Sequence, residues 1–312
     1  MDFRQLKYFI MVAEAKSFTR AAELLRLAQP ALSNQMQKLE DELQEQLLIR
    51  HSRGIELTDA GRRLLGHARA ILHQVDVALE DVCGARNEPE GLIRVGMPRS
   101  MSQVLAVELI LAAASVAPAV SIRIVEDFSE SLYALLLERE LDLALTYSTP
   151  GSIRVTAEVV LHRRLSLVSP VSSGIAATGD IPFAEVVRLP LILGSPAHVV
   201  RKLLESKAME QGTIPNIVHE VDSLQTTLNM VVGRLGHAVL PATVVRDAAE
   251  SGRVEIRTIV APELIRTLHI AWPAQSTPTR AQLIVRNLLK KLLQGHIENS
   301  DGCTVLTPAR AK

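Results

Sequence analysis

Five polar side chains between residues 29 and 38 have the chemistry needed to recognise the edges of DNA bases. They donate and accept hydrogen bonds, and only one is charged: Gln29, Ser33, Asn34, Gln37 and Lys38. Spacings of three and four residues place them on one side of a helix. Base edges in the major groove present a fixed pattern of donors and acceptors that amide and hydroxyl groups can match. The segment therefore predicts a sequence-specific contact with double-stranded DNA, with Lys38 near a phosphate.

Apolar residues of the same segment predict the helix that positions this polar face. One stripe recurs at spacings of four, three and four: Leu32, Met36, Leu39 and Leu43. Pro30 suits the first turn of a helix, because its missing N–H costs nothing there, and with Gln29 at the start of the helix it is also an expected DNA contact. A shorter helix precedes it, with Ser17 as a good N-cap, and the pattern breaks at residues 27–30. The two segments form a predicted helix-turn-helix.

The sequences on both sides of this helix pair favour DNA binding over a plain structural corner, which short helix pairs also form. A supporting helix with apolar periodicity precedes it at residues 3–13. Residues 46–50 and 54–57 alternate like two strands around a basic tip, which predicts a β-hairpin. Arg50 and Arg53 would then contact phosphate or the minor groove. The pattern as a whole is typical of a winged helix-turn-helix.

A second set of polar residues lies where predicted strands end and helices begin. Most carry hydroxyl groups, and two are basic: Arg99, Ser100, Ser102, Ser129, Thr146, Ser195, His198 and Ser223. For any single serine, helix capping is the simpler interpretation. Together they indicate a site surrounded by helix N-termini, whose unpaired N–H groups and positive dipole ends favour a carboxylate or another small anion.

Strands and helices alternate from residue 91 onward and would position these groups. The predicted strands cover 92–97, 120–125, 141–146, 165–168, 191–193, 217–221, 238–240 and 267–272, and the predicted helices 101–114, 129–138, 199–210, 224–234 and 279–293. This alternation predicts parallel sheets with helices on their faces, in two α/β lobes, with the last strand and helix returning to the first lobe. Ligands of such sheets lie beyond the carboxyl ends of the strands, which places the site between the lobes.

A long helix from about residue 60 to 85 connects the two parts, and Thr58 and Asp59 suit its start. Its apolar residues follow a heptad pattern: Leu65, Ala68, Leu72, Val75, Leu79 and Val82. A core helix of the same chain is the alternative interpretation. We favour self-association, because two recognition helices at spaced half-sites increase affinity and specificity.

Composition limits the class of protein. The 312 residues are 47% apolar and have a formal net charge of zero, so DNA affinity must come from a few placed contacts rather than a general basic field. Cys83 and Cys303 are far apart and lack metal-ligand spacing, which indicates unpaired thiols and no metal or other cofactor. No apolar run approaches the roughly 20 residues that span a bilayer, and the start is no signal peptide. We expect a soluble, cytoplasmic protein.

An enzyme and a solute-binding protein are the competing classes. Residues 194–198 place Ser195 near His198, but Pro196 would remove the N–H that serves an oxyanion hole, and no nucleophile-elbow glycine follows. The nine histidines are scattered, and no glycine-rich phosphate loop is present. A solute-binding protein would explain the two lobes but not the helix-turn-helix. The sequence therefore favours a regulator without catalytic residues.

Three sequence runs resemble the LysR-type transcriptional regulators: FRQLKYF, SFTRAAELLRLAQPALSNQMQKLEDEL and QLLIRHSRGIELTDAGRRLL. The resemblance is dense to about residue 72 and continues to about 293, and the opening is similar to nitrogen-assimilation-control-like members. It implies that the linker helices pair into dimers, that dimers often pair into tetramers, and that four residues match effector-pocket positions: Ser100, Ser129, Thr146 and Ser195. One departure is Gln44, because the family usually has glycine after the recognition helix.

The expected architecture is α/β: a winged helix-turn-helix and a long linker helix, followed by a two-lobed effector domain like a periplasmic binding protein. The expected divisions are a DNA-binding domain at 1–58, a dimerisation helix at 59–87, an effector domain at 88–296 (lobe 1 at about 91–161 and 268–296, lobe 2 at about 162–267) and a disordered tail at 297–312. The expected function is sequence-specific transcriptional regulation at a dyad-symmetric DNA site, modulated by a small organic or inorganic anion.

Overall fold

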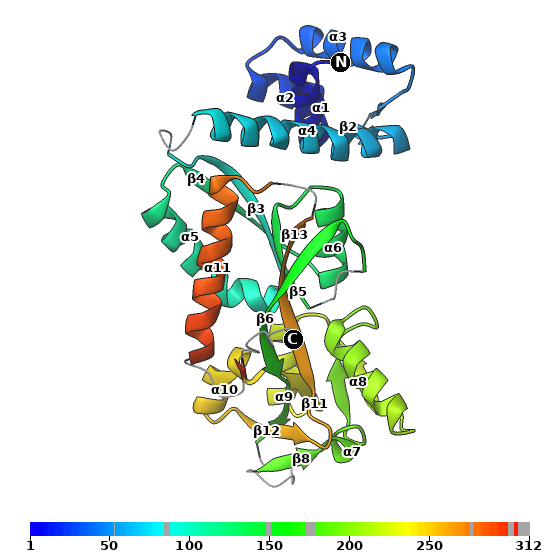
Figure 1. Cartoon of the computed structure of the whole chain (residues 1–312). Helices are drawn as coiled ribbons and strands as arrows, with labels where there is room; N and C mark the ends of the chain where they lie inside the picture. The colour runs from blue at the N-terminus through cyan, green and yellow to red at the C-terminus, as the bar shows by residue number, and fades with distance from the viewer. Residues whose placement is uncertain are drawn as a thin grey trace.

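The computed structural model describes residues 1–52, 54–83, 88–147, 151–171, 179–274, 277–298 and 303–304. Three bodies follow one another along the long axis of the molecule (Figure 1). We call them the head, lobe 1 and lobe 2. The long helix α4 lies between the rest of the head and lobe 1, and lobe 2 is farthest from the head.

The head is a winged helix-turn-helix, as predicted. Its elements are α1 (Phe3–Ala15), α2 (Phe18–Leu25), α3 (Gln29–Leu43), β1 (Leu48–His51) and β2 (Gly54–Leu57). β1 and β2 form the antiparallel hairpin of the wing. Ser17 caps α2, because its hydroxyl accepts a hydrogen bond from the N–H of Arg20. Leu32, Met36 and Leu39 of the apolar stripe of α3 are buried with Phe9 of α1 in one core, which leaves the polar side of α3 at the surface. Leu43, the last residue of the predicted stripe, is 36% exposed, so its assignment to the buried side was wrong.

Gln44 ends α3 in the left-handed conformation, with φ of 52°. A side chain in that conformation costs about 1 kcal/mol relative to glycine. The chain turns there toward the wing, and the N–H of Gln44 bonds to the carbonyl of Asp41. The wing is therefore attached to α3 through Gln44, a residue whose side chain makes its left-handed backbone conformation unfavourable.

The linker helix α4 (Asp59–Cys83) begins as predicted, since the Thr58 hydroxyl accepts from the N–H of Gly61 at 2.9 Å. Its heptad pattern is divided between two environments. Leu65 and Ala68 are 7% and 0% exposed in the core of the head, so their assignment to a dimer seam was wrong. They pack against their own chain because α1 lies across the first half of α4. Leu79 and Val82, at 57% and 85%, are exposed.

Lobe 1 contains the sheet order β14-β6-β13-β5-β3-β4, with helices packed against it. Its strands are β3 (Gly91–Met97), β4 (Val120–Glu126), β5 (Leu143–Thr146), β6 (Val155–Arg164), β13 (Ile265–Pro273) and β14 (Cys303–Thr304), and its helices α5 (Arg99–Val116), α6 (Ser129–Leu137) and α11 (Arg280–Glu298). β3 is parallel to β4 and β5, whereas β13 is antiparallel to β5 and β6. The predicted parallel sheet is present at β3, β4 and β5, but the sheet as a whole is mixed, because the returning strand β13 enters from the opposite direction.

Lobe 2 has the sheet order β10-β9-β11-β7-β12-β8. Its strands are β7 (Ser166–Pro170), β8 (Asp180–Pro182), β9 (Leu191–Leu193), β10 (Ile217–Glu220), β11 (His237–Leu240) and β12 (Val254–Val260), and its helices α7 (Phe183–Val186), α8 (Val199–Glu210), α9 (Leu224–Val232), the 3-10 turn η2 (Ala242–Val244) and α10 (Arg246–Glu250). β7 is antiparallel to both β11 and β12, so this sheet is also mixed.

Two long strands, β6 and β13, pair with each other and lead from lobe 1 into lobe 2 (Figure 1). The sequence predicted part of β13 but neither β6, β8 nor β12. The predicted disorder of residues 297–312 is corrected at two points: α11 extends to Glu298, and Cys303–Thr304 pair with β6 as β14. The remaining residues of that tail lie outside the described residues.

Among the described residues, α5 is the one helix that is long and apolar enough to cross a membrane by length and composition. In this fold it is a helix of lobe 1, because Met101, Leu105 and Leu109 are buried in the lobe's core and α11 packs beside it. Its opposite side exposes further apolar residues: Val107, Ile110, Leu111 and Val116. α5 thus has one buried and one exposed apolar face.

Candidate nucleic-acid interface and inter-lobe cleft

The surface of the head contains a groove between α3 and the first wing strand. Polar residues dominate its lining, which consists of Gln29, Pro30, Ser33, Asn34, Gln37, Glu40, Gln46, Leu48, Ile49 and Arg50. Six of the eight predicted DNA contacts therefore meet at one place. Lys38 is exposed on the same helix but does not line the groove, and Arg53 lies outside the described residues.

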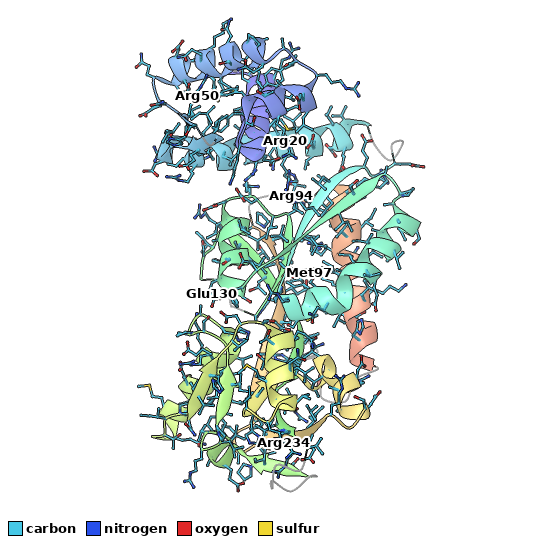
Figure 2. All side chains as sticks on the ribbon, turned by 180° about the vertical axis from the view of Figure 1, so that it is seen from behind. Arg20, Arg50, Arg94, Met97, Glu130 and Arg234 are labelled. Atoms are coloured by element: carbon cyan, nitrogen blue, oxygen red, sulfur yellow. The ribbon has the colours of Figure 1, made fainter. Side chains whose placement is uncertain are left out.

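Arg50 connects the wing to the recognition helix (Figure 2). One of its terminal nitrogens donates to the Ser33 hydroxyl at 2.9 Å, and its guanidinium lies 4.3 Å from the centre of the Phe18 ring. Glu40, the acidic residue of the groove, accepts from the N–H groups of Leu47 and Leu48 at 2.7 and 3.0 Å. Its charge is thus used to hold the first wing strand, so the groove keeps a cation and several amide and hydroxyl groups.

A cavity of about 260 Å³ lies between the two lobes. It is located at the carboxyl ends of β3, β4 and β5 in lobe 1 and of β9 and β11 in lobe 2. Four of the eight residues predicted for an effector site line it: Arg99, Ser100, Ser129 and His198. The position agrees with the general rule for ligands of α/β sheets.

The other four predicted residues do not line the cavity. Ser102 is buried one turn into α5, and Thr146 is buried inside β5. The backbone N–H of Ser195 binds the Asp222 carboxylate at 2.8 Å in the loop before α8, and Ser223 caps α9 by accepting from the N–H of Thr226. For Ser223 the simpler interpretation, helix capping, is the correct one.

Three side chains that sequence reasoning missed contribute most of the cavity's distinctive chemistry: Phe128, Tyr147 and Arg266. Each was adjacent to a predicted site or strand. Phe128 precedes Ser129, Tyr147 follows Thr146, and Arg266 precedes the predicted strand at 267–272. The signal that could have identified Arg266 was a charged residue within a strand that is mostly buried. Charged side chains are buried only where they have a role. Arg266 stacks on Tyr147, with 3.9 Å between the guanidinium carbon and the ring centre.

The His198 ring lines the cavity in its neutral form and not as a cation. Burial lowers its pKa from 6.5, and the positive charge of Arg266 lowers it further, against smaller opposing effects of Asp222 and Glu130. Its Nδ1 accepts from the N–H of Val200 at 3.3 Å, so the ring caps α8. The ring also lies edge-on to Phe128, with centres 5.9 Å apart.

The helix N-termini around the cavity differ between the lobes. In lobe 2 side chains cap them, His198 on α8 and Ser223 on α9. In lobe 1 the N-cap residues of α5 and α6 are Pro98 and Phe128, whose side chains carry no hydrogen-bonding group. The opening N–H groups of these two helices are therefore left to other acceptors, which a bound anion can supply.

A third cavity, of about 780 Å³, lies between the head and lobe 1 and is rich in charges. Glu14 of α1 pairs with Arg69 of α4 at 3.1 Å and with Arg94 of β3 at 3.5 Å. Arg69 also pairs with Glu140 at 3.1 Å, and the Arg94 N–H donates to Asp142 at 2.7 Å. Arg94 marks this contact between the two bodies in Figure 2. No group of three or more possible metal ligands occurs in the described part of the chain.

Comparison with known proteins gives a consistent result for both parts of the chain. Residues 3–62 match the family described as "Bacterial regulatory helix-turn-helix protein, lysR family", and residues 86–294 match "LysR substrate binding domain". The nitrogen assimilation regulatory protein nac of Escherichia coli (strain K12) is 29% identical over 303 residues, which cover 95% of this chain and 97% of that protein.

Two solved structures have the same fold. A full-length OxyR variant from Pseudomonas aeruginosa has a TM-score of 0.79 and 26% identity, with 94% of this chain and 95% of that chain covered. Full-length CbnR complexed with its target DNA has a TM-score of 0.54 and 23% identity, with 94% and 100% covered. The similarity extends over the head and both lobes.

Proposed function

The chain belongs to the LysR family of DNA-binding transcriptional regulators, and on that basis we propose that a small anion bound between its two lobes modulates its binding to DNA. The observation that carries the proposal is the inter-lobe cavity. Its lobe 1 side presents two helix N-termini without side-chain caps, and its wall contains the buried cation Arg266. Such an environment favours a negative charge on the ligand.

The polar groove of the head is the proposed DNA-reading surface. Asn34 and Gln37 are exposed amides on α3, and the positive charge of Arg50 adjoins them. In this proposal the two amides contact base edges in the major groove, while Arg50 and Lys38 contact DNA phosphates. A regulator that acts on the chromosome works in the cytoplasm, and we propose that location for this chain.

The test of the reading surface is a comparison of two alanine variants of the full chain. Asn34→Ala should cost about 1–3 kcal/mol of binding to the preferred site and relax base preference there, as expected for the loss of a bidentate base contact. Gln35→Ala, on the same helix but outside the groove lining, is the matched control and should leave preference unchanged. The measurement is selection from a random DNA pool. An unchanged preference in Asn34→Ala would remove that residue from the reading surface.

We further propose a dimer that pairs into a tetramer. Two separate apolar surfaces are exposed, Leu79 and Val82 on α4 and a second on α5 around Leu111. A closed assembly of four copies with two kinds of two-fold contact needs two distinct self-complementary surfaces. The dimer would present two α3 helices to the half-sites of a dyad-symmetric DNA site.

The proposed division of labour assigns residues 1–58 to DNA binding and 88–296 to effector binding, as expected above. Within the expected pairing segment 59–87, the exposed second half of α4 around Leu79 and Val82 is the proposed pairing surface. An effector can shift the lobes only if it binds one lobe arrangement more tightly than the other. The assembly would convert that preference into a change in spacing between the two heads.

A thermal-shift screen of the full chain against small organic and inorganic anions tests this proposal. A ligand at 100 times its dissociation constant adds about 2.7 kcal/mol of stability, which moves the melting temperature measurably. We expect at least one anion to stabilise the wild-type protein and to lose its effect in Ser129→Ala. A protein whose melting temperature and DNA affinity respond to no anion would argue against effector control by this cavity.

A further inference from the structure

The charges around the inter-lobe cavity favour a ligand with one negative charge over a ligand with two. Arg266 is the cation buried in the wall, with 6% of the residue exposed. Arg163 lies opposite it in the strand register, but its side chain contacts the sulfur of Met101 and does not line the cavity. Arg99 is at the surface and pairs with Glu126 at 3.8 Å. A second negative charge on the ligand would therefore be buried without a partner, at a large cost in desolvation.

Carboxylates of the lining strengthen this limit. Asp222 binds the Ser195 N–H, and Glu130 pairs with Lys202 at 2.9 Å. Both carboxylates are exposed near the rim, so they disfavour an anion with a second charge directed toward the rim. His198 supplies no compensating charge, because burial lowers its pKa and keeps the ring neutral near pH 7.

The remaining walls fit a flat apolar body. Three rings face the space, those of Phe128, Tyr147 and His198, and aliphatic side chains of lobe 2 close it: Ile192, Leu193, Val239, Leu240 and Val244. Aromatic ligands gain from edge-to-face and stacked contacts with such rings beyond the area they bury. The volume of about 260 Å³ is below the range of about 300–1,000 Å³ that is usual for ligand sites, so the body is no larger than one ring with small substituents.

The Tyr147 hydroxyl in this wall has no hydrogen-bond partner among the described residues. The Tyr147 residue is 7% exposed, and its hydroxyl has no hydrogen bond to any part of the chain that the structure describes. Buried polar groups in folded proteins are nearly always paired, and an exception at a cavity indicates a group that a ligand completes. The backbone N–H of Tyr147 is fixed by the Ser129 hydroxyl at 3.0 Å, which holds the residue in place.

We infer that the effector is a small aromatic monocarboxylate, whose carboxylate binds Arg266, the Tyr147 hydroxyl and the uncapped N-termini of α5 and α6, and whose ring lies against Phe128, His198 and the aliphatic wall. This inference rests on the proposed function and specifies its ligand class. Tight binding then requires both parts of the ligand, because the carboxylate binds to lobe 1 and the ring contacts the wall of lobe 2.

Titration calorimetry of the full chain with benzoate and four matched probes tests the ligand class. Cyclohexanecarboxylate keeps the charge and size but not the flat ring, benzamide keeps the ring but not the charge, and succinate and sulfate carry two charges without a ring. We expect benzoate to bind at least ten times more tightly than any of the four. Equal or tighter binding of cyclohexanecarboxylate, succinate or sulfate overturns the aromatic monocarboxylate assignment.

Two tyrosine variants test the position of the ligand. Tyr147→Phe removes a hydroxyl that has no partner among the described residues, so we expect unchanged thermal stability without ligand and about tenfold weaker benzoate binding. Tyr133→Phe is the matched control, because that buried hydroxyl also lacks a partner in the described structure but does not line the cavity. It should bind benzoate like the wild type. Arg266→Gln should abolish binding, and if it fails to fold, the tyrosine pair still decides the question.

The outcomes separate the ligand class from the proposed function. Benzoate binding that is equal in the wild type and Tyr147→Phe places the ligand elsewhere and overturns the inference. Sulfate or succinate binding that changes DNA affinity, with no benzoate binding, overturns the ligand class and leaves effector control intact. Absence of binding by every anion, together with specific DNA binding that none of them alters, overturns both.

Discussion

Gln44 is a residue whose side chain opposes its own backbone conformation. Its φ of 52° places it in the left-handed region, where glycine avoids a steric cost. We expect Gln44→Gly to raise the free energy of unfolding by up to about 1 kcal/mol, because the helix C-cap geometry is kept and the strain is removed. The measurement is urea unfolding of the full chain, monitored through a signal that reports on the head.

A glycine in the middle of the same helix is the control. Lys38→Gly should lower stability by about 1 kcal/mol, since it adds backbone freedom to the unfolded chain without relieving any strain. If both variants are destabilised to the same extent, then Gln44 is not strained, and another contact of its side chain must matter more.

Buried histidines predict how stability depends on pH. His237 and His269 are each 7% exposed, and burial lowers the pKa of both from 6.5. The unfolded chain takes up protons below pH 6.5 while the folded chain does not, so unfolding becomes easier as pH falls. The stability from burying neutral rings is present above pH 6.5 and declines below it until the folded-state pKa is reached.

We therefore expect the melting temperature to fall between pH 7 and pH 5, and to fall less steeply in His237→Asn, which keeps a group able to bond the Ser169 hydroxyl. His67→Gln, an exposed histidine on α4, should leave the slope unchanged. Melting curves across this pH range make the measurement. A slope that is the same in all three proteins would exclude His237 as a cause.

Residue-scale prediction from sequence reached the correct loops but not always the correct side chain. Thr146 and Tyr147 are adjacent, and only the second lines the cavity. Neighbouring residues of an extended chain point to opposite faces, so an error of one position exchanges core and cavity. All four residues of β5 are buried. The strand therefore lacks the polar–apolar alternation that would show which of its residues face the core and which face the cavity.

At the scale of elements, we assign two tasks to α4 that one heptad pattern conceals: packing in the head and pairing with a second copy. Leu65 and Ala68 complete the core of the head, whereas Leu79 and Val82 are exposed. The pattern could not separate these tasks, because a helix that packs on its own chain and a helix that packs on a partner have the same apolar spacing. The limits of helices were easier to predict from the sequence. α8 covers the predicted residues 199–210, because the capping residue and the apolar periodicity agree there.

We expect Leu79→Asp to convert the proposed dimer to a monomer and to weaken operator binding in parallel, because a charge would be buried in the proposed seam while Leu79 is 57% exposed in the single chain. Sedimentation velocity and DNA titration measure the two effects. Gln74→Asp, an exposed position on the same helix, should leave both unchanged. Leu111→Asp on α5 should stop assembly at the dimer. A Leu79→Asp protein that remains dimeric would transfer the pairing role to another surface.

At the scale of the whole molecule, two strands of lobe 1 connect the head to the inter-lobe cavity. β3 contacts Glu14 of the head through Arg94, and its carboxyl end leads to Arg99 in the cavity lining. β5 follows Asp142, which binds Arg94, and leads to Tyr147. Strands of a packed sheet are stiff, so we expect a ligand that moves the cavity end to displace the end at the head as well.

From this arrangement we predict that the Glu14 contact affects the coupling between effector and DNA rather than the binding of either. Glu14→Gln removes the charge that pairs with both Arg69 and Arg94. Allosteric coupling is typically about 1–3 kcal/mol, and we expect this variant to lose several-fold of the effector-dependent change in operator affinity. Effector affinity in the absence of DNA should stay within about twofold of the wild type, because Glu14 does not line the inter-lobe cavity.

The control for Glu14→Gln is Glu158→Gln, which breaks a pair with Lys290 that lies wholly within lobe 1. DNA titrations with and without effector, in wild type and both variants, give the coupling directly. Equal coupling in all three proteins would exclude the Glu14 contact as the route. The effect of effector would then have to pass through the pairing of copies, and the monomeric Leu79→Asp protein should lose it completely. Coupling that survives in Leu79→Asp but not in Glu14→Gln would instead locate the switch within a single chain.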